Sequence, residues 1–576
     1  MFQSKPESIT VLAFTKRFLL YVTVCSIGIF MSFYPTILSR FQAMQTDVGD
    51  TRLNHYFLEH SFQLISNDNY IGELWSPRFF YPYDEILTFS DNLFGSAPIY
   101  WFFRSLFDAD LSYQLWMIAV LTICFFSFLF LMTNLKVSPG ISAAGAFLFS
   151  FSMPRILQLG HQQLLPQFFT PLAFLSGWHF FQRPNRKDFL LFLIFIYLQV
   201  LAGIYLGWFL LFSLPIFFGI ACIIEPEGIS RLLTYWKTTW KLIIFSLLSW
   251  STIMFLTLLP YLKSGKVLGN RSYSEVDSML PRVISWFSVP LGSPWSFLLS
   301  WTSKHLPMAH EHYLFPGFVV VILAFITIWD IFRLEETLPK ERRSLVKICI
   351  FTFIVIFCLC IRLPFGFSAW RLVYELVPGA SVIRAVTRIW TIAYFYLFLG
   401  IFLFLDSLFK SYLVNKSKYY LVVLLTGLTI ALAISEQIVF SLPSFEKVVI
   451  RKDVSEMSQL MSQGCEVSYF YFDNVNHPFF AEQLSAMWAG IEANTPVVNG
   501  YSGNEPPNYG RSISEPKKPS EVFVWLNSFD KTRSSEACII AREDLEQKGL
   551  LSDLSIMSKN TSPSGNFYLY RLANIP

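Results

Sequence analysis

Two carboxylates that could take part in catalysis lie three residues apart, just after the first long apolar segment of the chain. Asp47 and Asp50 belong to the stretch DVGDTRLN, residues 47 to 54. Residues three apart share one face of a helix, and the glycine between them allows close approach. Such a pair could serve as a general base or bind a divalent cation, Mg²⁺ or Mn²⁺. The alternative is a solvated turn that caps the start of a helix.

A second polar cluster, PRILQLGHQQ at residues 154 to 163, lies between two short apolar segments. It holds an arginine, His161, Gln162 and two further glutamines. Such side chains are costly at membrane depth unless they line a cavity or pair with one another, which makes them candidates for a site. A hydrogen bond from His161 to a backbone carbonyl is the alternative.

A third cluster combines His305, His310 and His312 with Glu311, just before a later apolar segment. Neutral imidazoles and a carboxylate can bind zinc, but this spacing matches no standard closed zinc site. The identity of any metal stays open, and an interfacial loop is the more ordinary interpretation.

Arg384 and Arg388 form the fourth cluster, in PGASVIRAVTR at residues 378 to 388. Arginines four apart stack on one helical face, and guanidinium groups suit phosphate or diphosphate. An outward arginine pair calls for an anionic partner, because basic residues concentrate on the inner side of a membrane. The alternative partner is a carboxylate of residues 40 to 110.

Apolar helices must position these residues. Of the 576 residues, 53% are hydrophobic and 15% charged, and the mean hydropathy is +0.46, which excludes a soluble enzyme. A bilayer core takes roughly 20 apolar residues per helix, and this rule predicts a polytopic α-helical membrane protein with about eleven transmembrane helices. The predicted spans are 18–38, 111–135, 137–153, 166–181, 189–202, 206–224, 242–259, 314–329, 348–361, 389–405 and 419–435.

The run 189–224 carries no formal charge, and we divide it at the two glycines within residues 202–207, which favour a tight turn. One long kinked helix is the alternative.

Lysine and arginine in the short connections give the orientation, because they tend to stay cytoplasmic. Every second connection is basic, whereas residues 40–110 carry ten Asp or Glu against four Arg and no Lys. We expect a cytoplasmic N-terminus, a retained signal anchor as the first span, and residues 40–110 and 441–576 outside. The net charge of +4 reflects the basic connections and does not indicate nucleic-acid binding. The predicted inner-side residues are Lys5, Lys16, Arg17, Lys136, Arg183, Arg186, Lys187, Arg231, Lys237, Lys241, Arg333, Lys340, Arg342, Arg343, Lys347, Lys410, Lys416 and Lys418.

The chain therefore divides into a transmembrane domain, residues 1–440, and a soluble extracytoplasmic domain, residues 441–576. The second part has β-like runs at 466–472, 522–526, 538–541 and 567–572, a helix-like stretch at 542–548 and a loop at 499–509. These elements predict a small α/β or α+β unit. Cys465 and Cys538 each flank a β-like run, and a disulfide between them is a hypothesis.

Residues 40–110 are rich in aromatics, which suit amphipathic segments along the membrane interface. These aromatics are Trp75, Phe79, Phe80, Tyr81, Tyr83, Phe94, Tyr100 and Trp101. No phosphate-binding glycine loop, HExxH or GxSxG motif occurs, so nucleotide hydrolysis, zinc proteolysis and serine hydrolysis lack motif support.

In these motifs and their order along the chain, the sequence resembles the type-C (GT-C) superfamily of multispanning glycosyltransferases, in its uncharacterised bacterial branch. The matching residues are Gly49-Asp50, residues 76–82 with Asp91 and Pro98, Gly160-His161 before Pro171-Leu172, Glu311 with Tyr313 and Gly317, Arg384 to Arg388, and PVVNGYSG at 496–503.

The resemblance implies a GT-C-like fold that transfers a sugar, with inversion, from a polyprenyl-phosphate donor to a glycan, lipid or protein acceptor. The expected place is the outer face of a bacterial inner membrane, with membrane lipids as further partners. Asp50 becomes the general base, whereas Asp47 departs from a tight Asp-x-Asp pair, which leaves its role and any metal open. Arg384 and Arg388 would stabilise the leaving phosphate. His161, Gln162 and Glu311 would bind substrate.

Two other classes of function fit a polytopic protein. A transporter or flippase for a lipid-linked glycan often shows internal repeats, and none is found in this sequence. A non-catalytic cell-envelope factor would tolerate Asp50→Asn, which an enzyme with this base would not.

Overall fold

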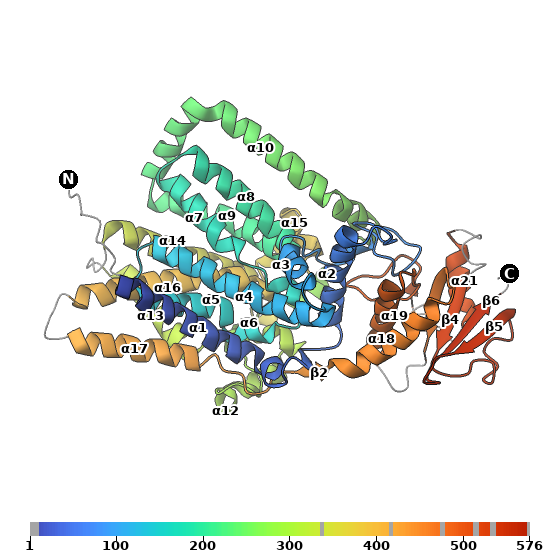
Figure 1. Ribbon diagram of the computed structural model, residues 1–576. Coiled ribbons are helices and arrows are strands. Elements are labelled where there is room, and N and C mark those ends of the chain that lie inside the picture. Colours follow the sequence, from blue (N-terminus) through green and yellow to red (C-terminus); the bar gives the residue numbers. More distant parts are fainter. Residues whose placement is uncertain are drawn as a thin grey trace.

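The computed structural model describes residues 11–333, 339–413, 419–472, 478–510, 518–529 and 537–572. A bundle of helices occupies one side of the molecule and the C-terminal part, with its small sheet, occupies the other (Figure 1). The helices of the bundle are α1 (Val11–Leu38), α4 (Ala109–Asn134), α5 (Pro139–Phe151), α6 (Met153–Leu157), α7 (Phe169–Gln182), α8 (Arg186–Ala202), α9 (Ile204–Ile224), α10 (Glu227–Leu268), α13 (Phe318–Phe332), α14 (Lys340–Cys360), α16 (Trp390–Leu413) and α17 (Tyr419–Ser435).

The bundle is that of an integral membrane protein. Within the described residues, seven helices are long and apolar enough to cross a membrane: α1, α4, α5 with α6, α9, α10, α14 and α16 with its preceding turn. α13 and α17 are apolar but shorter. Each of the eleven predicted spans coincides with a helix, since α7 and α8 carry the two remaining ones. Whether all eleven cross the bilayer stays a prediction.

The connections with basic residues meet at the end of the bundle away from the C-terminal part (Figure 1). Arg342 donates to the carbonyl of Leu135 at 2.8 Å and also pairs with Asp406. Lys410 pairs with the same carboxylate at 2.8 Å. These contacts fasten three connections together. By the positive-inside rule we expect this end to be the cytoplasmic one, and this orientation stays a prediction. Lys5, Lys416 and Lys418 lie outside the described residues.

The break predicted in the run 189–224 is confirmed. α8 ends at Ala202 and α9 begins at Ile204, and the two helices pack against each other. The long α10, by contrast, extends well beyond the predicted span at both ends. At about 1.5 Å per residue it is roughly twice as long as a bilayer core is thick. Its last turns contact residues 40–110, which we call the outer segment, since the hydroxyls of Ser264 and Thr88 lie 2.6 Å apart.

The outer segments connect the ends of the bundle helices with short elements. They are β1 (Ala43–Gln45), α2 (Asp50–Ser66), η1 (Ile86–Phe89), α3 (Ala97–Arg104), η2 (Gln162–Leu164), α11 (Tyr273–Ser278), η3 (Val283–Phe287), α12 (Ser296–Leu299), η4 (Ser300–His305), η5 (Ala309–His312), η6 (Pro364–Gly366), α15 (Trp370–Leu376), η7 (Ala380–Val382) and η8 (Val386–Ile389), where η marks 3₁₀ helices.

The expectation that the aromatics of residues 40–110 lie along the membrane interface is wrong for several of them. Phe79 and Phe80 are fully buried in the core of the C-terminal part, and Tyr100 is fully buried in the core of the bundle. α2 is buried on most sides from Thr51 to Ser61, because the bundle and the C-terminal helices enclose it. The outer segment therefore packs between the two cores.

The C-terminal part contains a four-stranded sheet in the order β3-β4-β6-β5, with β3 and β4 parallel and the other neighbours antiparallel. The cysteines at 465 and 538 form the hypothesised disulfide beside β3 and β4. The elements are β2 (Ser444–Glu446), α18 (Lys447–Met461), β3 (Val467–Tyr471), α19 (Phe479–Ala493), α21 (Ser520–Asn527), β4 (Ala537–Ala541), β5 (Ile556–Thr561) and β6 (Tyr568–Leu572).

Three of the four β-like runs are strands, but two local predictions are wrong. Residues 522–526 belong to helix α21, whose buried positions 522, 523, 525 and 526 follow a helical period rather than an alternation. Residues 542–548 form turns rather than a helix. Arg542 forms ion pairs with Asp453 and Glu482, and Asp544 accepts a hydrogen bond from Tyr570. These tertiary contacts override the helical propensity.

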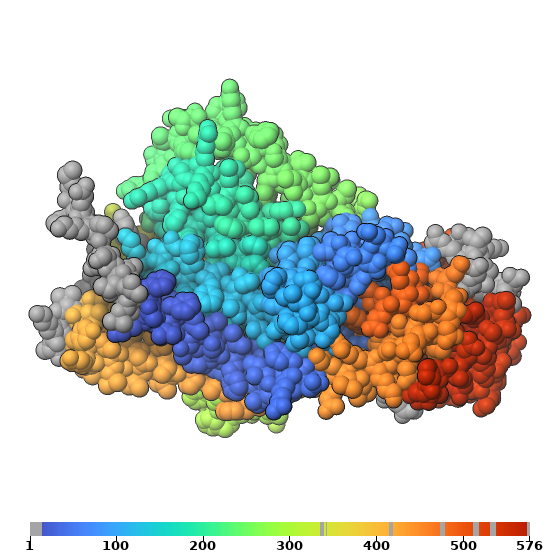
Figure 2. Space-filling view, in the orientation of Figure 1, coloured from blue at the N-terminus to red at the C-terminus, as the bar shows by residue number. Residues whose placement is uncertain are grey.

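Two backbone pairings join the outer segment to the C-terminal part. β1 pairs antiparallel with β2. Farther along, the amides of Phe80 and Tyr81 donate to the carbonyls of Asn499 and Val497, each at 3.0 Å. Gly500 permits this approach, since a Cβ there would lie 2.2 Å from the Phe80 ring. In the space-filling view the blue outer segment and the orange C-terminal helices form one continuous surface (Figure 2).

Candidate active site

Four charged side chains from separate outer segments meet beside the first turn of α2. Asp50 begins α2, His161 precedes η2, Glu311 lies in η5 and Arg388 lies in η8. We call these four residues the Asp50 chain. They are linked in that order, and the sequence separates their ends by more than three hundred residues.

His161 lies between two carboxylates. Its Nδ1 is 2.9 Å from Asp50 Oδ2 and its Nε2 is 3.3 Å from Glu311 Oε1. A ring with a carboxylate on each nitrogen is stabilised as the imidazolium, in which both nitrogens donate. The side chains of Asp50 and His161 keep 29% and 22% of their surface exposed, so this end of the chain is accessible.

Arg388 closes the other end of the chain. Its Nη2 lies 2.8 Å from Glu311 Oε1 and its Nε donates to Oε2 at 3.3 Å, with both side chains buried. This is a two-pronged pair of the kind that fixes guanidinium and carboxylate geometry. The anionic partner that Arg388 requires is therefore Glu311, and the predicted alternative, a carboxylate of residues 40–110, is wrong for this residue.

The charges act on one another. Burial raises the pKa of Asp50, but the hydrogen bond and charge of His161 and the charge of Arg388 outweigh burial and hold that pKa below its usual value. Burial and Arg388 lower the pKa of His161, yet its hydrogen bonds with Asp50 and Glu311 leave the pKa above the usual value. Burial opposes ionisation of Glu311, but Arg388 and His161 hold its pKa well below the usual range. The site thus favours the ionised forms of Asp50 and Glu311 and the protonated ring of His161 between them.

The C-terminal part contributes Tyr501 to this site. Its hydroxyl donates to Asp50 Oδ1 at 3.3 Å, on the carboxylate oxygen that His161 leaves free. Burial and the nearby Asp50 charge raise the pKa of Tyr501, so the phenol stays protonated and acts as a donor. The sequence argument missed Tyr501 as a site residue, although the segment 496–503 was singled out among the matching motifs.

Asp47 and Asp50 do not share a helical face, because α2 begins only at Asp50. Asp47 accepts a hydrogen bond from the amide of Gly49 at 2.7 Å, which makes the turn that leads into the helix. Burial, together with the charge of Asp50, raises the pKa of Asp47 despite that hydrogen bond. Gly160 fits closely beside it, because a Cβ at Gly160 would lie 2.8 Å from Asp47 Oδ2.

Gln162 is fully buried next to His161. Its amide nitrogen donates to the Thr51 hydroxyl at 2.8 Å, and its oxygen accepts from Asn54 at 3.2 Å. Both partners belong to α2, so Gln162 joins the loop that carries His161 to the helix that carries Asp50. The predicted contact with a substrate hydroxyl is not what its amide does here.

Arg384 and Arg388 do not stack on one helical face either. Arg384 lies in the connection between η7 and η8, with 41% of its side chain exposed and Glu275 at 3.9 Å. Its charge lowers the pKa of Tyr501, which places it near the open end of the site. Of the two arginines, Arg384 is the one available to an anion.

The three histidines of the third cluster separate. His305 and His310 are exposed, whereas His312 is buried with its Nδ1 2.8 Å from the Ser285 hydroxyl. Within the described parts of the chain, no three His, Cys, Asp or Glu side chains gather in an arrangement that could hold a metal ion. The ring of His161 lies between the carboxylates of Asp50 and Glu311, so these two do not gather around a common point. The residues present therefore do not fit a divalent cation.

Arg155, from the second cluster, is a structural residue. It is 1% exposed and donates to the carbonyls of Phe149 and Leu164 and to the side chain of Gln167. It fixes the chain between α5 and α7, on which the position of His161 depends.

No protein-family profile and no curated protein matches this sequence. Among solved structures, the crystal structure of ArnT from Cupriavidus metallidurans in the apo state is similar over 97% of this chain and 98% of that chain. The identity is 9% and the TM-score 0.35. A likeness at this level assigns neither a family nor an activity to the chain.

Proposed function

We propose that this protein is a membrane glycosyltransferase of GT-C type that moves a sugar from a polyprenyl-phosphate donor to an acceptor on the outer face of a bacterial inner membrane. The observation that carries the proposal is the Asp50 chain, which sets an ionised, partly exposed carboxylate at the outer end of an apolar bundle. Such a place suits a substrate with a lipid tail and a polar head.

In this proposal Asp50 is the general base. Its carboxylate takes the proton of the acceptor hydroxyl as that oxygen attacks the anomeric carbon, and the bond from that carbon to the donor phosphate breaks. The phosphate leaves with the electron pair and its charge grows, which a nearby cation stabilises. Arg384 supplies that cation, because it is exposed near Tyr501 whereas Arg388 is paired with Glu311.

The other members position the base. His161 donates to Oδ2 of Asp50 and so turns Oδ1 toward the acceptor, with Tyr501 beside it. Glu311, itself paired with Arg388, binds the far nitrogen of His161. Gln162 holds the loop that carries His161, and Asp47 makes the turn that leads to Asp50. No step requires Mg²⁺ or Mn²⁺ in this scheme.

The test uses purified protein in nanodiscs with radiolabelled polyprenyl-phosphate sugars. We expect wild type to consume a donor and Asp50→Asn to lose about 10³-fold or more in rate while its thermal unfolding is unchanged. Asp68→Asn is the matched control, since Asp68 is an exposed carboxylate of the same outer segment and should keep full turnover.

Equal turnover in Asp50→Asn and wild type would reject Asp50 as the base. If no donor of a broad panel is consumed by folded wild type, the transferase itself is rejected. Transport of a lipid-linked glycan would then be measured in reconstituted vesicles.

A further inference from the structure

A second polar cavity of about 420 Å³ lies on the opposite side of α2 from Asp50. It opens between α2, the start of α4 and the C-terminal helices α18 and α19. Arg52 and His55 of α2 line it, and Arg52 lies about 200° around the helix axis from Asp50. Thr51 lines it too, while its hydroxyl binds Gln162 of the first site. The two sites therefore share the first turn of one helix.

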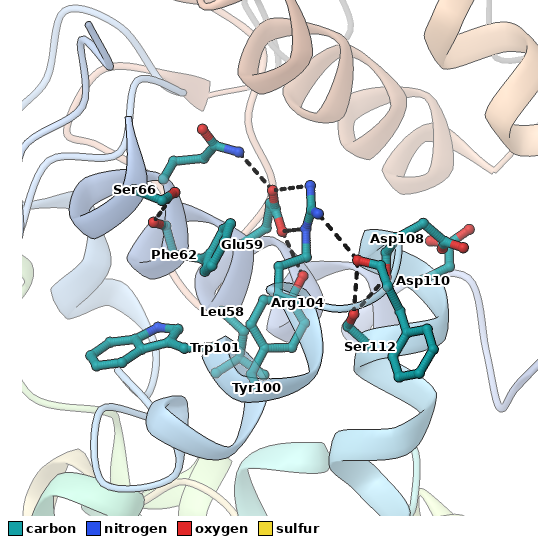
Figure 3. A network of polar contacts seen from close by, with 12 residues as sticks. Leu58, Glu59, Phe62, Ser66, Tyr100, Trp101, Arg104, Asp108, Asp110 and Ser112 are labelled. Atoms are coloured by element: carbon teal, nitrogen blue, oxygen red, sulfur yellow. Dashed lines mark hydrogen bonds and ion pairs between the residues drawn. The ribbon is translucent and has the colours of Figure 1, made fainter. Parts of the chain in front are cut away.

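Each cation that lines this cavity already has a partner among the described residues, and two of the four are ion-paired. Arg451 lies 2.6 Å from Asp108 Oδ1 and 2.5 Å from Asp110 Oδ2. Arg104 pairs with Glu59, with Arg104 Nε 2.9 Å from Glu59 Oε2, and donates to the carbonyl of Phe107 at 3.2 Å (Figure 3). Four cationic side chains and three carboxylates line the cavity, so the two signs nearly balance. Arg52 donates to the Ala481 carbonyl and the Ser485 hydroxyl, and Lys447 donates to Gln114. An anion would have to displace one of these contacts or ion pairs, whereas a neutral molecule with many hydroxyls would not.

One wall of the cavity is aromatic. The rings of His55 and Trp488 lie 4.5 Å apart, and His55 stacks on Tyr113 at the same distance. Burial lowers the pKa of His55 to about 3, so this ring is neutral. The rings of His55 and Trp488 are largely buried against one another, so they give the cavity a neutral apolar wall that the C–H groups of a sugar ring can contact.

Two further polar groups line the cavity. Among the described residues, no side chain hydrogen-bonds or forms an ion pair with Glu492, which lines the cavity from the end of α19. Ser455 of α18 is exposed and lines it as well. A carboxylate that accepts and a hydroxyl that both accepts and donates match the hydroxyls of a saccharide.

We propose that this cavity binds a neutral saccharide of one or two rings, and that this saccharide is part of the acceptor of the transfer reaction. The volume falls within the range of about 300 to 1,000 Å³ that is usual for small-molecule sites. The saccharide site stands on the cavity itself, whereas its assignment to the acceptor rests on the proposed function.

The experiment uses the full-length protein in nanodiscs and saturation-transfer NMR with maltose, cellobiose and diacetylchitobiose. We expect at least one disaccharide to bind saturably. Ser455→Trp, which fills the cavity from an exposed helical position, should weaken binding by about tenfold or more. Lys452→Trp adds the same bulk to an exposed position of α18 outside the cavity and should bind as wild type does. Glu492→Gln should weaken binding without affecting folding.

The outcomes separate the two proposals. If no disaccharide binds, or if Ser455→Trp binds as wild type does, the saccharide site is rejected whatever the donor assay shows. Binding that Ser455→Trp removes, in a protein that consumes no donor, keeps the site and rejects the transferase. If both hold, Ser455→Trp should raise the KM for a glycan acceptor by about tenfold, whereas Lys452→Trp should leave that KM as in wild type. An unchanged KM would overturn the assignment to the acceptor.

Discussion

Two groups of paired charges flank α2, and they differ in how fully their carboxylates are engaged. In the Asp50 chain, Asp50 gives one oxygen to His161 and keeps the other for a single long contact with Tyr501, with 29% of the side chain exposed. On the opposite side, Glu59 accepts from Gln63 and Tyr100 and forms both contacts with Arg104, with 5% exposed.

The comparison distinguishes a reactive carboxylate from a structural one. Both carboxylates have a cationic partner, so pairing alone does not identify a base. Glu59 has no acceptor capacity left, and water or substrate cannot reach it (Figure 3). Asp50 keeps an accessible oxygen at the end of a rigid chain, which is the arrangement a general base needs.

The sharpest way to test this contrast is to neutralise one buried carboxylate on each side. Glu311→Gln and Glu59→Gln each leave an arginine without its carboxylate, which costs about 3 kcal/mol of folding free energy. Only Glu311→Gln should also abolish donor turnover, because only Glu311 holds His161. Thermal unfolding and turnover are measured on both variants. Loss of turnover in Glu59→Gln as well would mean that the two sides of α2 are not functionally distinct.

The pH dependence of the Asp50 chain should be asymmetric. The pKa of Asp50 is lower in the folded than in the unfolded protein, so its ionised carboxylate stabilises the fold above the unfolded-state pKa of about 3.9. This contribution is lost only as the pH falls through the lower folded-state pKa. The pKa of His161 is higher in the folded than in the unfolded protein, so its protonated ring contributes fully to stability below the unfolded-state pKa of about 6.5. This contribution is lost as the pH rises through the folded-state pKa.

We therefore expect turnover to stay constant from about pH 5 to 6.5 and to fall on the alkaline side. His161→Gln should be slower and lose that alkaline fall, whereas His310→Gln, at an exposed histidine outside the site, should keep the profile of wild type. An alkaline fall that persists in His161→Gln would assign it to another group.

Tyr501→Phe probes the contribution of the C-terminal part to the site. It removes one hydrogen bond to Asp50, so we expect turnover to fall by about five- to tenfold, equivalent to about 1 kcal/mol, with little change in stability. Tyr70→Phe is the control, because its hydroxyl bonds His60 at 2.8 Å away from the site. That variant should lose stability and keep turnover; the reverse pattern would remove Tyr501 from the site.

Arg451→Met should give the smallest effect. Arg451 is half exposed, and its pairs with Asp108 and Asp110 are screened by solvent, so the loss of stability should be about 0.5–1 kcal/mol. Donor turnover should not change. Measured by thermal unfolding, the difference from wild type should shrink in high salt. A salt-independent loss above that size would show that the pairs act as a buried clamp.

The helices were predictable from the sequence because lipid enforces a simple rule, about 20 apolar residues per span. Eleven such runs were found, and each is a helix. The shorter elements were less predictable. The run at 522–526 is rich in β-forming residues and is nevertheless helical, because its buried positions suit a helix packed on the C-terminal core.

The candidate residues were predictable by type, but several of their partners and roles were not. His161 was selected because polar side chains at membrane depth are costly, and Asp50 because of its spacing from Asp47. Glu311 was selected as a possible metal ligand beside histidines, and Arg388 as a guanidinium that suits phosphate. No pattern of residues indicated that Arg388 pairs with Glu311, that Gln162 binds α2, or that Tyr501 reaches Asp50. Those pairs span sequence separations of 77, 111 and 451 residues.

By itself, the sequence determined that the chain lies in a membrane, which segments are helical there, and which charged residues need partners, because burial of apolar surface and the cost of unpaired charge act on each segment separately. Only the tertiary structure decided which charges neutralise one another and which oxygen stays open. The Asp50 chain is assembled from four segments, and its geometry exists only once the bundle and the C-terminal part enclose α2.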